Sequence, residues 1–238
     1  MRPTPGVTST GRRAARAAAG ACAALAACSG LVWAALTLTD ATPDDPAAPA
    51  PCAYTATRGG KGPGLPPAGF AGAARPYTAD LVTNRGTVTI EVLTAAAPCA
   101  AHSFAHLARK AYFAGGACHR LTTSGIFVLE CGDPAGGDAG GPGYSFPDEN
   151  LTGAAYPAGT VALSKAAPGR NGSRFFLGYA DPAVPMDPAW TPFAKVVGGL
   201  DVLRRIAANG TADGSTDGPP ARPVVLESVT VHRPPGDR

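Results

Sequence analysis

The sequence predicts a mainly β domain, built either as a closed barrel or as a sandwich, with two helices. Short runs rich in β-branched and aromatic residues recur between residues 77 and 232, and glycine and proline separate them. Only two stretches have the apolar spacing of a helix. The chain has 238 residues, of which 45% are hydrophobic, so a core of ordinary size can be buried. The pattern alone does not choose between a barrel and a sandwich.

The expected elements follow in chain order. A hairpin comes first, because two β-branched runs flank Asn84-Arg85-Gly86. Pro98, which fits the first turn of a helix, opens a segment with helical apolar spacing. A second helix is expected over residues 200–206, stopped by Asn209-Gly210. The expected strands are residues 77–83, 87–93, 117–121, 126–131, 160–164, 175–179, 193–197 and 224–232.

The chain outside residues 77–232 divides into four further segments. Residues 1–16 are basic, and residues 17–39 are an uncharged run long enough to span a bilayer as a helix. Positive charge precedes this run and does not follow it, so we expect the N-terminus in the cytoplasm and the remainder outside. Residues 40–76 are rich in proline, alanine and glycine and are expected to form a disordered linker. Residues 233–238 are a tail.

Three interpretations of residues 17–39 stay open. The preferred one is an uncleaved, single-pass membrane anchor. The second is a lipoprotein signal, because Cys28 follows small residues. The third is a secretory signal peptide that is cleaved. All three predict that the domain lies outside the cytoplasmic membrane.

The cysteines beyond the apolar run are expected in a compartment where disulfides persist. Cys118 and Cys131 flank two predicted antiparallel strands, so they are a disulfide candidate, with two buried free thiols as the alternative. A Cys52–Cys99 bridge is a weaker candidate, because Cys52 lies in the linker. No pair has the C-x-x-C spacing of a zinc or redox site, so a metal centre is not expected.

Several functional classes have little support. The net charge is only +3, and no basic stripe is interleaved with aromatic residues, which argues against nucleic-acid binding. His102 and His106 lack the glutamate of a zincin site and are expected to face solvent. The glycine-rich loop 132–143 lacks the lysine of a phosphate-binding loop. Ser164 and Ser173 lack the elbow motif of a hydrolase.

Three motifs carry a family resemblance. They are Cys118-His119-Arg120, Cys131-Gly132-Asp133-Pro134 and Asn171-Gly172-Ser173-Arg174-Phe175-Phe176. In this order they resemble the motifs of cyclophilin-type peptidyl-prolyl cis-trans isomerases, and the third is the most specific. The resemblance covers residues 77–232. It implies a closed, eight-stranded antiparallel β-barrel capped by two α-helices, acting on X-Pro peptide bonds.

Arg120 is the expected catalytic residue. It lies between strand-forming residues, where a guanidinium is unfavourable unless it is paired or serves a ligand. Rotation about a peptide bond has a barrier of about 18–20 kcal/mol, and a catalyst only has to favour the twisted amide. The resemblance implies that Arg120 donates to the proline nitrogen or to the adjacent carbonyl in that state. Such a mechanism needs no nucleophile, metal or cofactor.

The resemblance also implies a substrate-binding pocket, with an apolar part for the proline ring and polar departures from the family pattern. Charged residues replace two glutamines and one asparagine, a serine replaces an alanine, and a tryptophan falls near the usual histidine. The loop that bears the family's tryptophan is also replaced, which makes sensitivity to cyclosporin doubtful. The expected substrate-binding residues are Phe127, Val128, Glu130, Ser164, Lys165, Arg174, Phe176, Met186 and Trp190.

Glu130 and Arg174 thus carry opposite charges where the family pattern has neutral glutamines. We expect Glu130 to pair with Arg174, with Arg120 or with both. Capture of Arg120 by Glu130 would lower turnover. The preferred function is a membrane-tethered, monomeric isomerase that acts on proline-containing segments of exported proteins. The alternative is a catalytically weak proline-peptide binding or chaperone module on the same fold.

Overall fold

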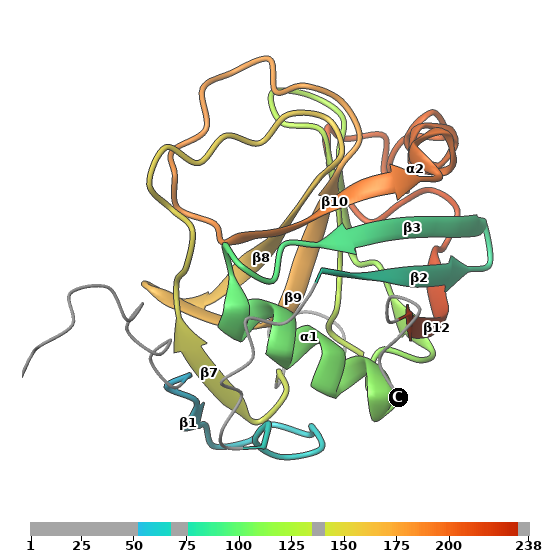
Figure 1. The fold of residues 1–238 in the computed structure, drawn as a ribbon. Coiled ribbons are helices and arrows are strands. Elements are labelled where there is room, and N and C mark those ends of the chain that lie inside the picture. The colour runs from blue at the N-terminus through green and yellow to red at the C-terminus, as the bar shows by residue number, and fades with distance from the viewer. Residues whose placement is uncertain (1–51, 68–75, 135–140, 233–238) are drawn as a thin grey trace, which may run out of the picture. The chain divides into compact units, whose positions relative to one another are not determined.

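The computed structural model describes residues 52–67, 76–134 and 141–232 (Figure 1). The predicted basic segment 1–16, the predicted anchor or signal 17–39 and the tail 233–238 lie outside these residues. In the described part of the chain, no helix is both long and apolar enough to cross a membrane.

The described residues form a curled antiparallel sheet with two helices, which confirms the predicted mainly β fold (Figure 1). The helices are α1 (Pro98–Arg109) and α2 (Leu200–Ala207). The strands are β1 (Thr55–Ala56), β2 (Tyr77–Thr83), β3 (Gly86–Val92), β4 (Gly116–Ala117), β5 (Arg120–Thr122), β6 (Val128–Cys131), β7 (Tyr144–Pro147), β8 (Thr160–Ala167), β9 (Arg170–Gly178), β10 (Pro192–Gly198), β11 (Asp217–Gly218) and β12 (Val225–His232).

The strands follow one continuous path of pairing. Its order is β11-β5-β6-β9-β8-β10-β3-β2-β12-β4, while β7 pairs with β9 and β1 pairs with β7. The sheet of the described residues has twelve strands, so the predicted count of eight is not confirmed. The β2–β3 hairpin lies where the sequence predicts it, with Thr83 opposite Gly86. Residues on β2 alternate in burial, as expected for a strand with one face on the core.

The sheet turns a corner at Cys118 and His119. The predicted strand 117–121 is two short strands here, because the chain changes its pairing partner between them. The N–H of Cys118 donates to the carbonyl of Val224, beside β12, at 2.9 Å. The N–H of His119 donates instead to the carbonyl of Glu130 on β6 at 3.0 Å. The corner places Arg120 at the first position of β5.

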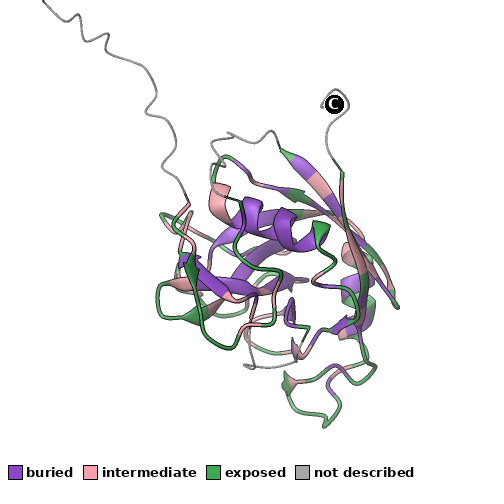
Figure 2. Cartoon of the chain, turned by 90° about the horizontal axis from the view of Figure 1, so that it is seen from below, coloured by how far each residue is buried: buried purple, intermediate pink, exposed green. Residues whose placement is uncertain are grey.

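Helix α1 supplies the centre of the core. Its residues 100–108 are buried, and Figure 2 shows this helix as a largely buried element. The ring of Phe104 packs against Phe113, Phe175 and Phe193 at centroid distances of 5.4, 5.9 and 5.3 Å. Aromatic side chains bury large apolar areas, so this cluster ties α1 to β9 and β10.

A carboxylate from a distant loop completes the start of α1. The N-cap residue Ala97 makes no side-chain hydrogen bond, so the first N–H groups of the helix need another partner. Glu149 accepts from the N–H groups of Cys99 and Ala100 at 3.0 and 2.8 Å. An anion is favoured at this end of a helix, and the contact fixes the loop that follows β7.

Residues 52–67, which we call the strap, are ordered against the domain. Cys52 is joined to Cys99 by a disulfide, and β1 pairs with β7. The hydroxyl of Tyr54 also donates to the carbonyl of Cys99 at 2.7 Å. The expectation of a disordered linker over residues 40–76 is therefore wrong for the strap. A covalent bond and edge pairing hold it, and neither depends on apolar periodicity.

The strap also covers the two histidines of α1. His102 and His106 are each only 8% exposed, so the expectation that they face solvent is wrong. Nδ1 of His102 lies 3.3 Å from the Tyr54 hydroxyl, and Nε2 of His106 lies 3.2 Å from the carbonyl of Gly64. Burial, together with the charges of His106 and Arg109, lowers the pKa of His102 to about 4.

A second disulfide lies beside the corner. It joins Cys118, next to β4, to Cys131 at the end of β6. Cys118 lies shortly before Arg120 in the sequence, and Cys131 directly follows Glu130, so the bond links the segments that carry these two residues. The corner is thereby held covalently as well as by the backbone hydrogen bonds of Cys118 and His119.

Candidate active site

A cavity of about 190 Å³ lies on the outer face of β6, β8 and β9. The structure brings to it every predicted catalytic or substrate-binding residue except Phe127. Its volume suits a single side chain or ring better than a large ligand. Its lining residues are Arg120, Ile126, Val128, Glu130, Ser164, Lys165, Arg174, Phe176, Met186 and Trp190.

Ile126 occupies the place in the cavity that the motif comparison gives to Phe127. Phe127 packs instead against the main core and Tyr179, with ring centroids 5.9 Å apart. Successive side chains of an extended segment point to opposite faces, so Ile126 and Val128 share the cavity face and Phe127 does not. Alternation of side chains along the segment from Val128 predicts Ile126 on the cavity face.

The apolar wall of the cavity is a small cluster separate from the main core. Val128, Phe176 and Tyr156 are buried in it, and Met186 and Trp190 pack against them. The ring of Trp190 meets Phe176 edge to face at a centroid distance of 6.2 Å. The Tyr156 hydroxyl donates to the carbonyl of Trp190 at 2.8 Å and accepts from its N–H at 3.0 Å. Tyr156, which the sequence did not single out, therefore fixes the tryptophan.

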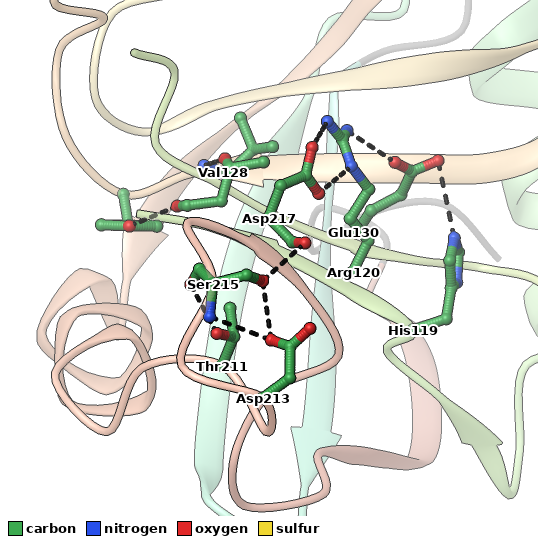
Figure 3. Close-up of polar contacts among 10 residues, drawn as sticks. His119, Arg120, Val128, Glu130, Thr211, Asp213, Ser215 and Asp217 are labelled. Atoms are coloured by element: carbon green, nitrogen blue, oxygen red, sulfur yellow. Dashed lines mark hydrogen bonds and ion pairs between the residues drawn. The ribbon is translucent and has the colours of Figure 1, made fainter. Parts of the chain in front are cut away.

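Arg120 is held by two carboxylates (Figure 3). Its Nε and Nη2 donate to the two oxygens of Asp217 at 2.7 and 2.8 Å. Its Nη1 donates to Oε2 of Glu130 at the longer distance of 3.4 Å. Mainly through its hydrogen bonds, Asp217 raises the pKa of Arg120 further, so the guanidinium stays charged. The expected contact between Arg120 and Glu130 is therefore present.

Glu130 is a buried carboxylate, only 7% exposed. Oε1 lies 3.7 Å from Nε2 of His119, and Oε2 contacts Arg120. Burial alone would raise the pKa of Glu130. The hydrogen-bonding interactions of His119 and Ser164 and the attraction of His119 and Arg120 outweigh burial and lower this pKa to about 2. Glu130 is therefore an anion at neutral pH.

The opposite rim of the cavity has its own polar contacts. The Lys165 side chain forms an ion pair with Asp148. Nη2 of Arg174 donates to the carbonyl of Lys165 at 2.6 Å, so that carbonyl already has one partner.

A second, larger cavity of about 470 Å³ adjoins the first and shares Ser164 and Arg174 with it. Thr57 and Arg58 of the strap line this cavity. The N–H of Thr57 donates to the carbonyl of Gly143 at 2.9 Å, which fixes the strap beside it. The strap therefore borders a cavity that adjoins the smaller one. Within residues 52–67, 76–134 and 141–232, no cluster of three or more His, Cys, Asp or Glu side chains could hold a metal ion.

Asp217 is the polar residue of the site that the sequence did not indicate. It lies in a two-residue strand within a turn-rich segment, 97 residues beyond Arg120. So short a strand has no periodicity to detect, and an aspartate before a glycine indicates a turn. Only the pairing of β11 with β5 brings it to Arg120.

The depressed pKa of Glu130 predicts a pH dependence of stability. Since the pKa falls from 4.5 to about 2 on folding, Glu130 stabilises the fold above pH 4.5, and this contribution is lost as the pH falls toward 2. Glu130→Gln does not titrate. The free energy of unfolding of wild type, relative to that of the variant, should fall by about 2 kcal/mol between pH 7 and pH 3 in urea titrations. Parallel curves over that range would contradict the assignment.

The family described as "Cyclophilin type peptidyl-prolyl cis-trans isomerase/CLD" matches residues 78–231. A Mycobacterium tuberculosis protein named "Probable peptidyl-prolyl cis-trans isomerase B" is 40% identical over 163 residues, which cover 63% of this chain and 52% of that protein. A Mycobacterium leprae protein of the same name is 40% identical over 166 residues, covering 64% and 56%. This chain thus spans about half the length of the curated relatives it matches.

A solved structure of a Cryptosporidium parvum cyclophilin type peptidyl-prolyl cis-trans isomerase superposes with a TM-score of 0.57 and 22% identity, covering 68% of this chain and 100% of that one. At this identity the likeness concerns the fold. The family match extends over most of the ordered domain, and the residues that carry the predicted site converge on one cavity. This chain therefore belongs to the family of cyclophilin-type peptidyl-prolyl cis-trans isomerases.

Proposed function

We propose that this protein is a peptidyl-prolyl cis-trans isomerase that binds proline-containing segments of other chains as a monomer. The observation that carries the proposal is Arg120, a charged donor held in a cavity that has one apolar wall. The Cryptosporidium parvum enzyme was also solved in the presence of the dipeptide Ala-Pro, which supports proline-containing peptides as the substrate class.

The reaction requires stabilisation of a twisted amide. In that state the proline nitrogen is no longer conjugated and accepts a hydrogen bond better than in the planar amide. The proline ring would lie against Phe176 and Val128, with Trp190 beside it, while the acyl side turns. Arg120 would donate to the nitrogen or to the adjacent carbonyl. A donor that meets its acceptor only in the twisted state lowers the barrier and does not merely tighten binding.

One observation favours the alternative of a weak proline-peptide binding or chaperone module. Glu130 carries its negative charge next to the guanidinium and inside the cavity lining. A carboxylate there competes with the substrate carbonyl for Arg120. The contact is long, at 3.4 Å, so we favour reduced activity over lost activity.

The proposal includes a location outside the cytoplasmic membrane and exported proteins as clients. Two features support it. The chain has two disulfides within the domain and strap, and disulfides persist in oxidising compartments. The basic residues followed by the uncharged run 17–39 match a membrane anchor, with a lipoprotein signal through Cys28 or a cleaved signal peptide as the alternatives.

The location predicts the state of the chain in cells. It should sediment with membranes, and its four cysteines from Cys52 onward should resist alkylation until they are reduced. The mass of the mature chain then separates an intact anchor from a lipid on Cys28 or a cleaved peptide. A chain found in the soluble cytoplasmic fraction, with thiols that alkylate without reduction, would show the location to be wrong.

The activity predicts a large effect at Arg120. Full-length wild type should accelerate cis–trans exchange in an Ala-Pro-Phe peptide, and Arg120→Ala should lower kcat/KM about 100-fold, because the donor to the twisted amide is gone. Arg205→Ala, which removes an arginine paired with Asp201 on α2, is the matched control and should retain activity. A wild type that binds the peptide and does not accelerate exchange would favour the binding module instead.

Glu130→Gln is expected to raise activity. The amide keeps an oxygen beside Arg120 but removes the charge that competes with the substrate, so kcat/KM should rise about two- to fivefold. Exchange rates from magnetisation-transfer NMR on the same peptide would measure it. A fall in kcat/KM would mean that the carboxylate helps to hold Arg120 and does not restrain it.

A further inference from the structure

The segment between α2 and β12 places Asp217 beside Arg120, the proposed catalytic residue. The two residues of β11 pair with β5, so that Asp217 lies opposite Thr122 and Gly218 opposite Leu121. The N–H of Thr123 also donates to the carbonyl of Thr216 at 2.9 Å. These contacts attach the segment directly to the strand that carries Arg120.

Asp217 binds one edge of the guanidinium of Arg120. Both of its oxygens are used, by Nε at 2.7 Å and by Nη2 at 2.8 Å, as Figure 3 shows. Bidentate contact between a carboxylate and a guanidinium fixes the plane of the arginine as well as its position. A single hydrogen bond would leave that plane free to rotate.

Asp217 contacts the guanidinium from outside the cavity. Arg120, Glu130 and Ser164 line the cavity, whereas Asp217 does not, and its side chain is 52% exposed. A guanidinium carries five N–H donors. Among the residues that the structure describes, Asp217 and Glu130 take three of them, which leaves two N–H groups. Asp217 thus holds the arginine without occupying the space where a proline peptide would bind.

The segment around Asp217 has its own internal support. The Ser215 hydroxyl donates to the carbonyl of Asp217 at 2.9 Å, and it also contacts Oδ1 of Asp213 at 2.6 Å. Asp213 accepts from the N–H of Ser215 at 3.0 Å, and Thr211 donates to the carbonyl of Ser215 at 2.5 Å (Figure 3). The turn is therefore held by hydrogen bonds of its own, in addition to the contact between Asp217 and Arg120.

We propose that Asp217 is a positioning residue, which orients the guanidinium of Arg120 so that its two remaining donors face the cavity. This inference rests on the proposed isomerase function. The opposite possibility is that Asp217 withdraws Arg120 from the substrate and inhibits the enzyme. The two differ in sign, because loss of a positioning contact lowers turnover and loss of an inhibitory contact raises it.

The test compares Asp217→Ala and Asp217→Asn with wild type in the full-length protein. Asp217→Ala should lower kcat between about 10- and 100-fold with KM nearly unchanged, because the arginine acts in the twisted state and its misplacement affects that state most. Asp217→Asn keeps one acceptor oxygen and should fall between the two. Asp201→Ala, which breaks an exposed aspartate–arginine pair on α2, is the matched control and should leave kcat unchanged.

A spectroscopic measurement separates positioning from general stability. The Nε–H signal of Arg120, assigned by its loss in Arg120→Lys, should be resolved and slow to exchange in wild type and should collapse in Asp217→Ala. The thermal midpoints of the two should stay close, because the contact is half-exposed. An unchanged or increased kcat in Asp217→Ala, with an active wild type, overturns this inference alone. An inactive wild type overturns the proposed function, and the inference with it.

Discussion

The positive charge of Arg120, in a cavity with an apolar wall, is the constraint on which the rest of this site depends. A guanidinium there needs carboxylates or a ligand, and Asp217 and Glu130 each take part of it. Glu130 is buried, so it depends on Arg120 in return. The corner at Cys118 and His119 makes the arrangement possible, because it places β5 between β6, which carries Glu130, and β11, which carries Asp217.

The parts of the fold with a clear period could be predicted from the sequence, and the parts held by single contacts could not. The hairpin at Asn84-Arg85 and the helix that begins at Pro98 lie where alternation and helical spacing place them. The strap has no such period. Its order depends on the Cys52–Cys99 bond and on a two-residue strand, and a composition rich in proline and glycine predicts disorder in the absence of those contacts.

The residues of the site likewise differ in how far the sequence predicts them. Motif order identified most of the cavity, because residues on adjacent strands of a sheet keep their relative places once the pairing is known. It misplaced Phe127, since the face of a side chain is set by alternation along the strand, and Ile126 shares the parity of Val128. Asp217 could not be found at all, because its partner is 97 residues away and only β11–β5 pairing joins them.

Two of the charges that replace neutral residues of the family pattern lie beside opposite charges. Glu130 faces Arg120, and Lys165 faces Asp148. Opposite charges paired this closely cancel much of their field at a ligand, and salt screens the exposed part further. In the proposed isomerase, recognition of proline then depends on the shape of the apolar wall formed with Phe176 and Trp190. In the same proposal the rate depends on a different quantity, which is the direction in which the remaining donors of Arg120 point.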